Sequence, residues 1–140
     1  METVLVTGAG GFIGRALCEA LAASGRNLRK ALRAARPDSA GAVAVGDIGP
    51  DTDWSAALEG VDCIVQLAAR THLLRETAAD SLAAYRRTNV AGSERLARSA
   101  AALGVRRLVF LSSVKVHGER TGPRPFMEDD APRPEDDYGA

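Results

Sequence analysis

The chain has 140 residues, 46% of them hydrophobic, which suits one compact domain with a buried core. Lys plus Arg and Asp plus Glu both number 18, and this zero net charge gives no reason to expect a nucleic-acid or membrane-surface partner. The apolar run at residues 4–6 is short and follows no basic segment. We therefore expect neither a signal peptide nor a membrane span, and we place the protein in the cytoplasm.

Strand-length apolar stretches alternate with segments of helical period along the chain. Residues 4–7 predict a strand and residues 12–24 a helix that Gly25 ends, and one face of this helix carries Ile13, Leu17, Leu21 and Ser24. Further strands are predicted at residues 28–33, 43–45, 61–67 and 107–112. Asp51 or Asp53 caps a short helix that runs to Leu58. The longest helix precedes the last strand along a stripe spaced by three and four: Leu82, Tyr85, Asn89, Gly92, Leu96, Ser99 and Leu103.

This alternation predicts an α/β fold, a doubly wound parallel sheet of Rossmann type, over residues 1–117. Residues 118–140 are rich in Pro, Glu and Asp and predict an irregular loop over the carboxyl edge of the sheet.

The cysteines and histidines of the chain lack the spacing of metal ligands, so no metal is expected. Cys18 and Cys63 lie in apolar segments and are interpreted as buried hydrophobes, with a reactive thiol as the alternative. His72 and His117 are interpreted as loop residues, and Lys115 as a contact to substrate or to a loop.

A glycine-rich turn joins the first strand to the first helix. Gly8 permits a tight turn, Gly11 lets the backbone approach a pyrophosphate, and Gly14 allows close helix packing. The free N–H groups at the start of the helix favour an anion. The alternative is a glycine-rich turn without a ligand.

The spacing Gly-x-x-Gly-x-x-Gly resembles the extended short-chain dehydrogenase/reductase family, also called the NAD-dependent epimerase/dehydratase family. The resemblance covers almost the whole chain and implies a role in cofactor binding for the following residues of the loop and of the later strands: Phe12, Ile13, Asp47, Ile48, Leu67, Ala68, Ala69 and Asn89. Asp47 and Ile48 look like the family's adenine contact. The segment 65–69 resembles its fourth-strand motif, with Gln66 where His is usual.

Four of these residues have simpler interpretations. Asp47 caps the next turn, Asn89 is a hydrogen-bonded polar residue between helix and sheet, or Ala68 and Ala69 merely pack at the end of a strand.

The segment 110–118 resembles the family's fifth-strand motif, with His117 where Tyr is common. By this resemblance Ser113 hydrogen-bonds a sugar oxygen and Tyr138 transfers the proton while hydride moves to or from nicotinamide. Tyr138-Gly139-Ala140 looks like the start of the family's Tyr-x-x-x-Lys helix, whose lysine position lies beyond Ala140. The alternative is an ordinary loop tyrosine.

The end of the second strand bears on the choice between NAD and NADP. Residues 30–33 contain no carboxylate, and Arg33 suits the 2′-phosphate of NADP, which we slightly favour over NAD. The alternative is that Arg33 belongs to a solvated edge.

The resemblance implies an NAD(P)-dependent epimerase, dehydratase or 4-keto reductase of a nucleoside-diphosphate sugar, with a homodimer as a possible assembly. The alternatives are a non-catalytic dinucleotide-binding or sensing module and a reductase of non-sugar carbonyls. Since the family's enzymes add a C-terminal substrate lobe, we expect residues 1–140 to be a fragment truncated after the fifth strand, with Tyr138 on a frayed terminus and no activity alone.

Overall fold

The computed structural model of the protein describes residues 1–34, 40–71 and 81–140. Its centre is a five-stranded sheet in the order β3-β2-β1-β4-β5, and each neighbouring pair is parallel. The strands are β1 (Thr3–Thr7), β2 (Asn27–Leu32), β3 (Ala42–Ala44), β4 (Cys63–Gln66) and β5 (Arg107–Phe110). Because the order of the strands reverses beside β1, the predicted doubly wound α/β fold is confirmed.

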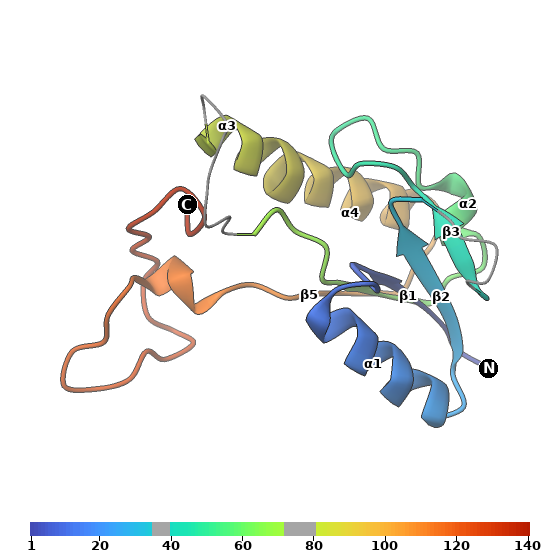
Figure 1. Cartoon of the computed structure of the whole chain (residues 1–140), viewed down its shortest axis with the longest axis horizontal. Helices are drawn as coiled ribbons and strands as arrows, with labels where there is room; N and C mark the ends of the chain where they lie inside the picture. The colour runs from blue at the N-terminus through green and yellow to red at the C-terminus, as the bar shows by residue number, and fades with distance from the viewer. Residues whose placement is uncertain (35–39, 72–80) are drawn as a thin grey trace.

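Helices cover both faces of this sheet, with α1 on one side and α3 and α4 on the other (Figure 1). Val4 and Val6 pack with Cys18 of α1 (Phe12–Ala23), whereas Leu5 points to the opposite face. That second face is covered by α2 (Ser55–Leu58) and α4 (Gly92–Ala102). Its largest fully buried side chains are Leu5, Trp54, Leu58, Ile64 and Leu96. Burial of each aliphatic side chain of this size contributes about 1.5–3 kcal/mol, so these two layers hold the sheet in place.

The strands end earlier than the apolar runs predict. The segments 61–67 and 107–112 form strands only at Cys63–Gln66 and Arg107–Phe110. The reason is the short central strand, since Thr7 pairs with Gln66 and Gln66 with Phe110 at its carboxyl end. Beyond these last residue pairs, the segments that follow Gln66 and Phe110 leave the sheet and continue as loops.

The longest helix is interrupted by a π-helical segment. It consists of α3 (Ser81–Tyr85), the π-helix η1 (Arg86–Ala91) and α4, and the N–H of Gly92 bonds the Arg87 carbonyl five residues earlier. The predicted stripe holds for Tyr85 and Leu96, which are buried, but not for Leu103, which is 54% exposed. The difference arises because α4 ends at Ala102 and the chain turns at Gly104, where φ is 74°.

Both cysteines are free and buried, and burial raises the pKa of each thiol. This agrees with their interpretation as small hydrophobic core residues, because a reactive thiol needs a lowered pKa. Within residues 1–34, 40–71 and 81–140, no helix is both long and apolar enough to cross a membrane.

The segment 118–140 contains neither helix nor strand and extends outward beyond the carboxyl end of β5, as Figure 1 shows in orange and red. The expectation of an irregular loop is therefore confirmed. The expectation of a frayed terminus is wrong, because Tyr138 lies with its ring edge-to-face against Tyr85, their centroids 5.8 Å apart at 61°. This aromatic pair docks the end of the chain on α3.

Candidate active site

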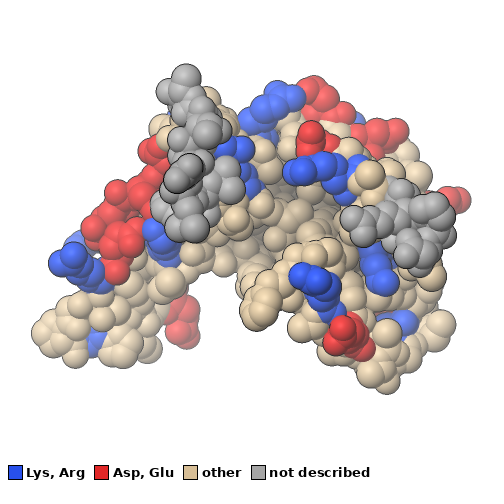
Figure 2. Space-filling view, in the orientation of Figure 1, with Lys and Arg blue, Asp and Glu red and all other residues tan. Residues whose placement is uncertain are grey.

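The carboxyl ends of β1, β4 and β5 place three loops side by side. Thr7 is followed by the glycine loop at residues 8–14, Gln66 by residues 67–70, and Phe110 by residues 111–113. In an open parallel sheet this edge is where ligands bind. The surface has a concave outline between α1 and the C-terminal segment (Figure 2). Acidic side chains gather on the C-terminal segment.

Two glycines of the glycine loop are required by close backbone contacts. Gly8 has φ of 68°, and a Cβ there would lie 2.8 Å from the backbone nitrogen of Ala68. A Cβ on Gly14 would lie 2.1 Å from the Gly8 carbonyl oxygen and 2.8 Å from the Cα of Ala9. At Gly11 the nearest atom, the Gly8 carbonyl oxygen, is 3.2 Å away. The tight turn and close packing predicted for Gly8 and Gly14 are therefore confirmed, whereas a Cβ at Gly11 would make a tight contact that is much less severe than the one at Gly14.

The start of α1 fits a dinucleotide pyrophosphate. Gly11 is the N-cap residue and provides no side chain, the first helical turn contains no acidic residue, and the first intrahelical bond runs from the N–H of Arg15 to the Gly11 carbonyl. The preceding N–H groups of the first turn thus remain for an anion. Phe12 and Ile13 are 91% and 53% exposed, so Ile13 does not share the buried face of α1 expected from its spacing. Only from Gly14 onward does α1 lie on the sheet.

Thr7, which the sequence interpretation did not single out, fixes the loop after β4. It is fully buried, and its hydroxyl oxygen accepts hydrogen bonds from the N–H groups of Leu67 (3.2 Å) and Ala68 (3.1 Å). The sequence feature that could have indicated this role is a threonine at the end of the predicted first strand, directly before the first glycine. Leu67 packs against the α1 side of the core, and Ala69 is exposed.

Asn89 fixes the other end of the same loop. Its side-chain oxygen accepts from the Arg70 N–H at 2.8 Å, and its Nδ2 donates to the Arg70 carbonyl at 2.9 Å. Asn89 lies in the π-helical segment, which aims this amide at the loop. The two bonds match the interpretation as a hydrogen-bonded polar residue, so a cofactor contact of Asn89 stays a prediction.

Gln66 points into the protein. It is 2% exposed, and its Nε2 donates to the hydroxyl of Ser93 on α4 at 2.5 Å. Gln66, which stands where the family usually has His, thus links sheet and helix through Nε2, while its buried Oε1 has no hydrogen-bond partner among the described residues.

Arg33 and Asp47 lie together beyond the ends of β2 and β3. Arg33 Nε is 2.6 Å from Asp47 Oδ1, and both side chains are 83% exposed. The backbone holds them adjacent, since Val45 N–H donates to the Leu32 carbonyl and Gly46 N–H to the Arg33 carbonyl. Asp47 thus pairs with Arg33 instead of capping a turn with its side chain.

Ile48 faces inward and packs on α4, where a Cβ at Gly92 would lie 2.7 Å from its Cγ2. A cofactor contact at this position would therefore involve the backbone. Neither Asp51 nor Asp53 is the N-cap of α2, which is Trp54, but the Asp53 carboxylate accepts from the N–H and hydroxyl of Ser55, the first residue of that helix.

Ser113 follows β5 and is the N-cap of the 3₁₀-helix η2 (Val114–His117), where its hydroxyl oxygen accepts from the Lys115 N–H at 3.3 Å. Ser113 also lines a hollow of about 440 Å³ together with Met127 and Glu128. Ser113 therefore borders an open surface hollow at the carboxyl end of β5.

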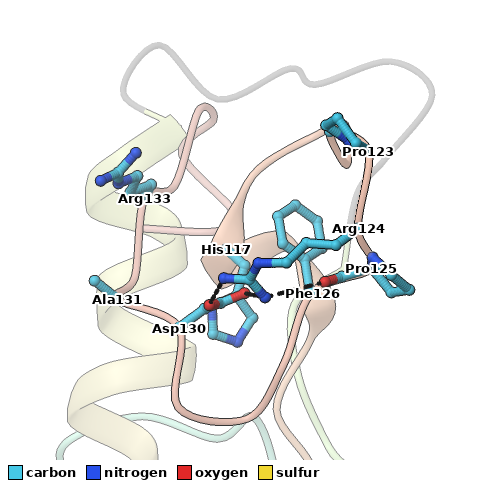
Figure 3. A pocket seen from close by; sticks show the side chains of 9 residues that line it. His117, Pro123, Arg124, Pro125, Phe126, Asp130, Ala131 and Arg133 are labelled. Atoms are coloured by element: carbon cyan, nitrogen blue, oxygen red, sulfur yellow. Dashed lines mark hydrogen bonds and ion pairs between the residues drawn. The ribbon is translucent and has the colours of Figure 1, made fainter.

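A second cavity, of about 360 Å³, lies under the loop 122–133 (Figure 3). His117 stacks on Phe126 with ring centroids 5.6 Å apart, and Arg124 pairs with Asp130 at 2.5 Å. The interpretation of His117 as a loop residue is corrected here, because His117 is the last residue of the 3₁₀-helix η2 and packs on Phe126. His72 lies outside the described residues. Within residues 1–34, 40–71 and 81–140 there is no group of acidic, His and Cys side chains that suits a metal ion.

Residues 4–140 match the sequence model of the NAD dependent epimerase/dehydratase family. The chain belongs to this family. It is 39% identical over 141 residues to a UDP-glucose 4-epimerase of Vibrio cholerae, which covers 99% of this chain and 43% of that protein. A 3-diazoavenalumate denitrifying reductase of a Streptomyces species is 35% identical over 135 residues, or 92% of this chain and 43% of that protein.

The solved structure of MoeE5 in complex with UDP-glucose and NAD is similar with a TM-score of 0.82 at 34% identity, over 98% of this chain and 44% of that one. This chain spans less than half the length of these relatives. The shared fold and family confirm the Rossmann-type unit.

Proposed function

We propose that the protein carrying this chain is an NAD(P)-dependent epimerase, dehydratase or 4-keto reductase of a nucleoside-diphosphate sugar. The observation that carries the proposal is the placement of the uncapped start of α1 and of Ser113 at one edge of a parallel sheet. The similarity to a protein named UDP-glucose 4-epimerase and to a complex with UDP-glucose and NAD supports the sugar nucleotide as substrate class.

Each residue has one role in this proposal. The N–H groups of the glycine loop bind the pyrophosphate, Asp47 lies at the adenosine end, and Thr7 and Asn89 hold the loop after β4. Ser113 donates a hydrogen bond to a sugar oxygen, and Tyr138 transfers a proton to or from it. The bound nicotinamide supplies the hydride acceptor or donor.

A reductase of non-sugar carbonyls is the second candidate, because the Streptomyces relative carries the name of a reductase without a sugar substrate. A dinucleotide-binding module without turnover is the third, and it requires neither Ser113 nor Tyr138.

The test is nicotinamide oxidation or reduction by the full-length protein with UDP-, GDP- and dTDP-sugars and with non-sugar ketones. Turnover of ketones alone would exclude the sugar proposal, and turnover of neither class would favour the binding module.

We also propose that Arg33 favours NADP over NAD and that Asp47 opposes this preference. The ion pair uses one of the five N–H donors of the guanidinium and leaves others for a 2′-phosphate, while the Asp47 carboxylate repels that phosphate. Arg33→Ala should lower the NADP-to-NAD affinity ratio roughly tenfold to a hundredfold, as expected for a charged hydrogen bond. Asp47→Asn should raise the ratio roughly twofold to fivefold, as expected between exposed charges.

Calorimetric titration of both dinucleotides measures this ratio. Arg98→Ala, on the outer surface of α4, removes an exposed arginine of another ion pair and serves as the control. An unchanged ratio in Arg33→Ala would show that Arg33 belongs to a solvated edge.

A homodimer through the helix that contains Asn89 is a further part of the proposal. α3 and α4 form the outer layer on their face of the sheet, where a second copy can reach them (Figure 1). Light scattering at several protein concentrations tests it, and a mass of one chain at all of them would contradict it.

A further inference from the structure

Three consecutive residues at the end of the chain are each held by a different partner. Asp136 Oδ2 lies 2.5 Å from Lys115 Nζ, the carboxylate of Asp137 accepts a hydrogen bond from the Ser81 hydroxyl, and the Tyr138 ring packs on Tyr85. Ser81 and Tyr85 both belong to α3, whereas Lys115 belongs to η2, the 3₁₀-helix capped by Ser113. The segment that carries Tyr138 is therefore fixed between α3 and the loop that follows β5.

Asp136 uses its two carboxylate oxygens for two different tasks. Oδ1 accepts from the N–H of Gly139 at 2.7 Å, and the Asp136 carbonyl accepts from the N–H of Ala140 at 3.1 Å. These are the bonds of an N-cap and of a first α-helical turn, so Tyr138 lies inside a capped turn. Oδ2 remains for the ammonium of Lys115.

Lys115 contacts the segments of both hydroxyl residues. Its backbone N–H donates to the Ser113 hydroxyl, and its carbonyl oxygen lies so near Gly139 that a Cβ there would be 2.6 Å from it. Its ammonium also pairs with Glu119 at 2.6 Å. The pairing lowers the pKa of Asp136 and raises that of Lys115, so both groups are charged at neutral pH.

We propose that Lys115 and Asp136 are positioning residues whose ion pair fixes the capped turn and thereby sets where Tyr138 lies relative to Ser113. The catalytic consequence rests on the proposed function, in which Ser113 and Tyr138 act on the same substrate oxygen. The structural consequence, which is the docking of Tyr138 on Tyr85, is independent of the proposed function.

Two substitutions remove the Lys115–Asp136 ion pair; Asp136→Asn leaves the pair of Lys115 with Glu119 in place, whereas Lys115→Met removes both pairs. Asp136→Asn keeps an N-cap residue of nearly equal quality, so the turn stays capped while the charge is lost. Lys115→Met keeps most of the aliphatic stem, and Lys115→Arg keeps the charge. Glu94→Gln, which removes an exposed 2.6 Å ion pair with Arg98 on α4, is the matched control.

Proton NMR of residues 1–140 tests the docking directly. The wild type, Glu94→Gln and Lys115→Arg should show nuclear Overhauser effects between the Tyr85 and Tyr138 rings. Asp136→Asn and Lys115→Met should lose most of this intensity. Full intensity in both of the latter variants would overturn the proposal.

Kinetics of the full-length protein test the catalytic consequence. Displacement of a reacting group by about an ångström costs on the order of a hundredfold in rate, so we expect kcat of Asp136→Asn and Lys115→Met to fall at least tenfold. The KM for the dinucleotide should stay unchanged, and Lys115→Arg should restore most of kcat. Undiminished turnover in Tyr138→Phe would refute the proposed function, whereas loss in Tyr138→Phe with wild-type kcat in both pair variants would refute the role of the ion pair alone.

Discussion

Gly14→Ala is expected to destabilise the protein by about 3 kcal/mol or more. The new Cβ would lie 2.1 Å from the Gly8 carbonyl oxygen and 2.8 Å from the Cα of Ala9, and both are backbone atoms that cannot rotate away. Overpacking usually costs about 1–3 kcal/mol when side chains adjust, and here α1 itself would have to move from β1. The free energy of unfolding, measured by urea denaturation, gives the size of the effect.

Gly10→Ala is the matched control for this prediction. Gly10 lies in the same loop, but a Cβ there would touch only Leu32 Cδ2 at 3.9 Å, an ordinary van der Waals distance. Its unfolding free energy should stay within about 0.5 kcal/mol of the wild type. Equal stability of the two variants would mean that α1 does not approach the glycine loop as closely as described.

Tyr138→Phe is expected to reduce turnover of the full-length protein by roughly a hundredfold to ten-thousandfold, the range of a lost general acid or base. Ser113→Ala should reduce kcat as well, because the substrate oxygen loses its hydrogen-bond donor. Both variants should keep dinucleotide affinity, since neither residue lies in the glycine loop. Turnover and calorimetric affinity of the same samples separate the two effects.

Residues 1–140 alone are expected to show no turnover. The docked Tyr138 removes the argument from a frayed terminus, so the expectation rests on the lysine of the family's Tyr-x-x-x-Lys pattern, whose position lies beyond Ala140. That cation would stabilise the phenolate that transfers the proton. Measurable turnover by residues 1–140 would contradict this assignment.

The glycine loop and the fold class are predictable because they depend on local rules. A glycine at a sharp turn and another under a helix follow from backbone sterics, and runs of apolar residues of strand length between helical segments leave few topologies. Strand ends are less predictable, since they depend on partners. Leu67 and Leu111 are apolar although they lie beyond the sheet, where Leu67 packs in a loop and Leu111 is exposed. Only the register of the strands paired with β1 and β4 shows where pairing stops.

Contacts between distant segments could not be predicted from the sequence. The hydroxyl of Thr7 holds a loop through bonds to residues that lie 60 and 61 positions later in the sequence. The π-helical segment at residues 86–91 turns Asn89 to the loop after β4, although its sequence suits an ordinary helix. The docking of Tyr138 likewise combines Lys115, Ser81 and Tyr85, which no local pattern relates to the end of the chain.

The most direct test of the account is calorimetric titration of NAD and NADP into residues 1–140, for the wild type and for Gly11→Val. Gly11 is the residue directly before α1, and a Cβ there would lie 3.2 Å from the Gly8 carbonyl oxygen, against 2.1 Å at Gly14. A valine at Gly11 should therefore block the approach of a pyrophosphate while straining the fold less than a change at Gly14. We predict weak, saturable binding to the wild type and none to a folded Gly11→Val variant. Equal binding by both proteins would show that the glycine loop is not the dinucleotide site.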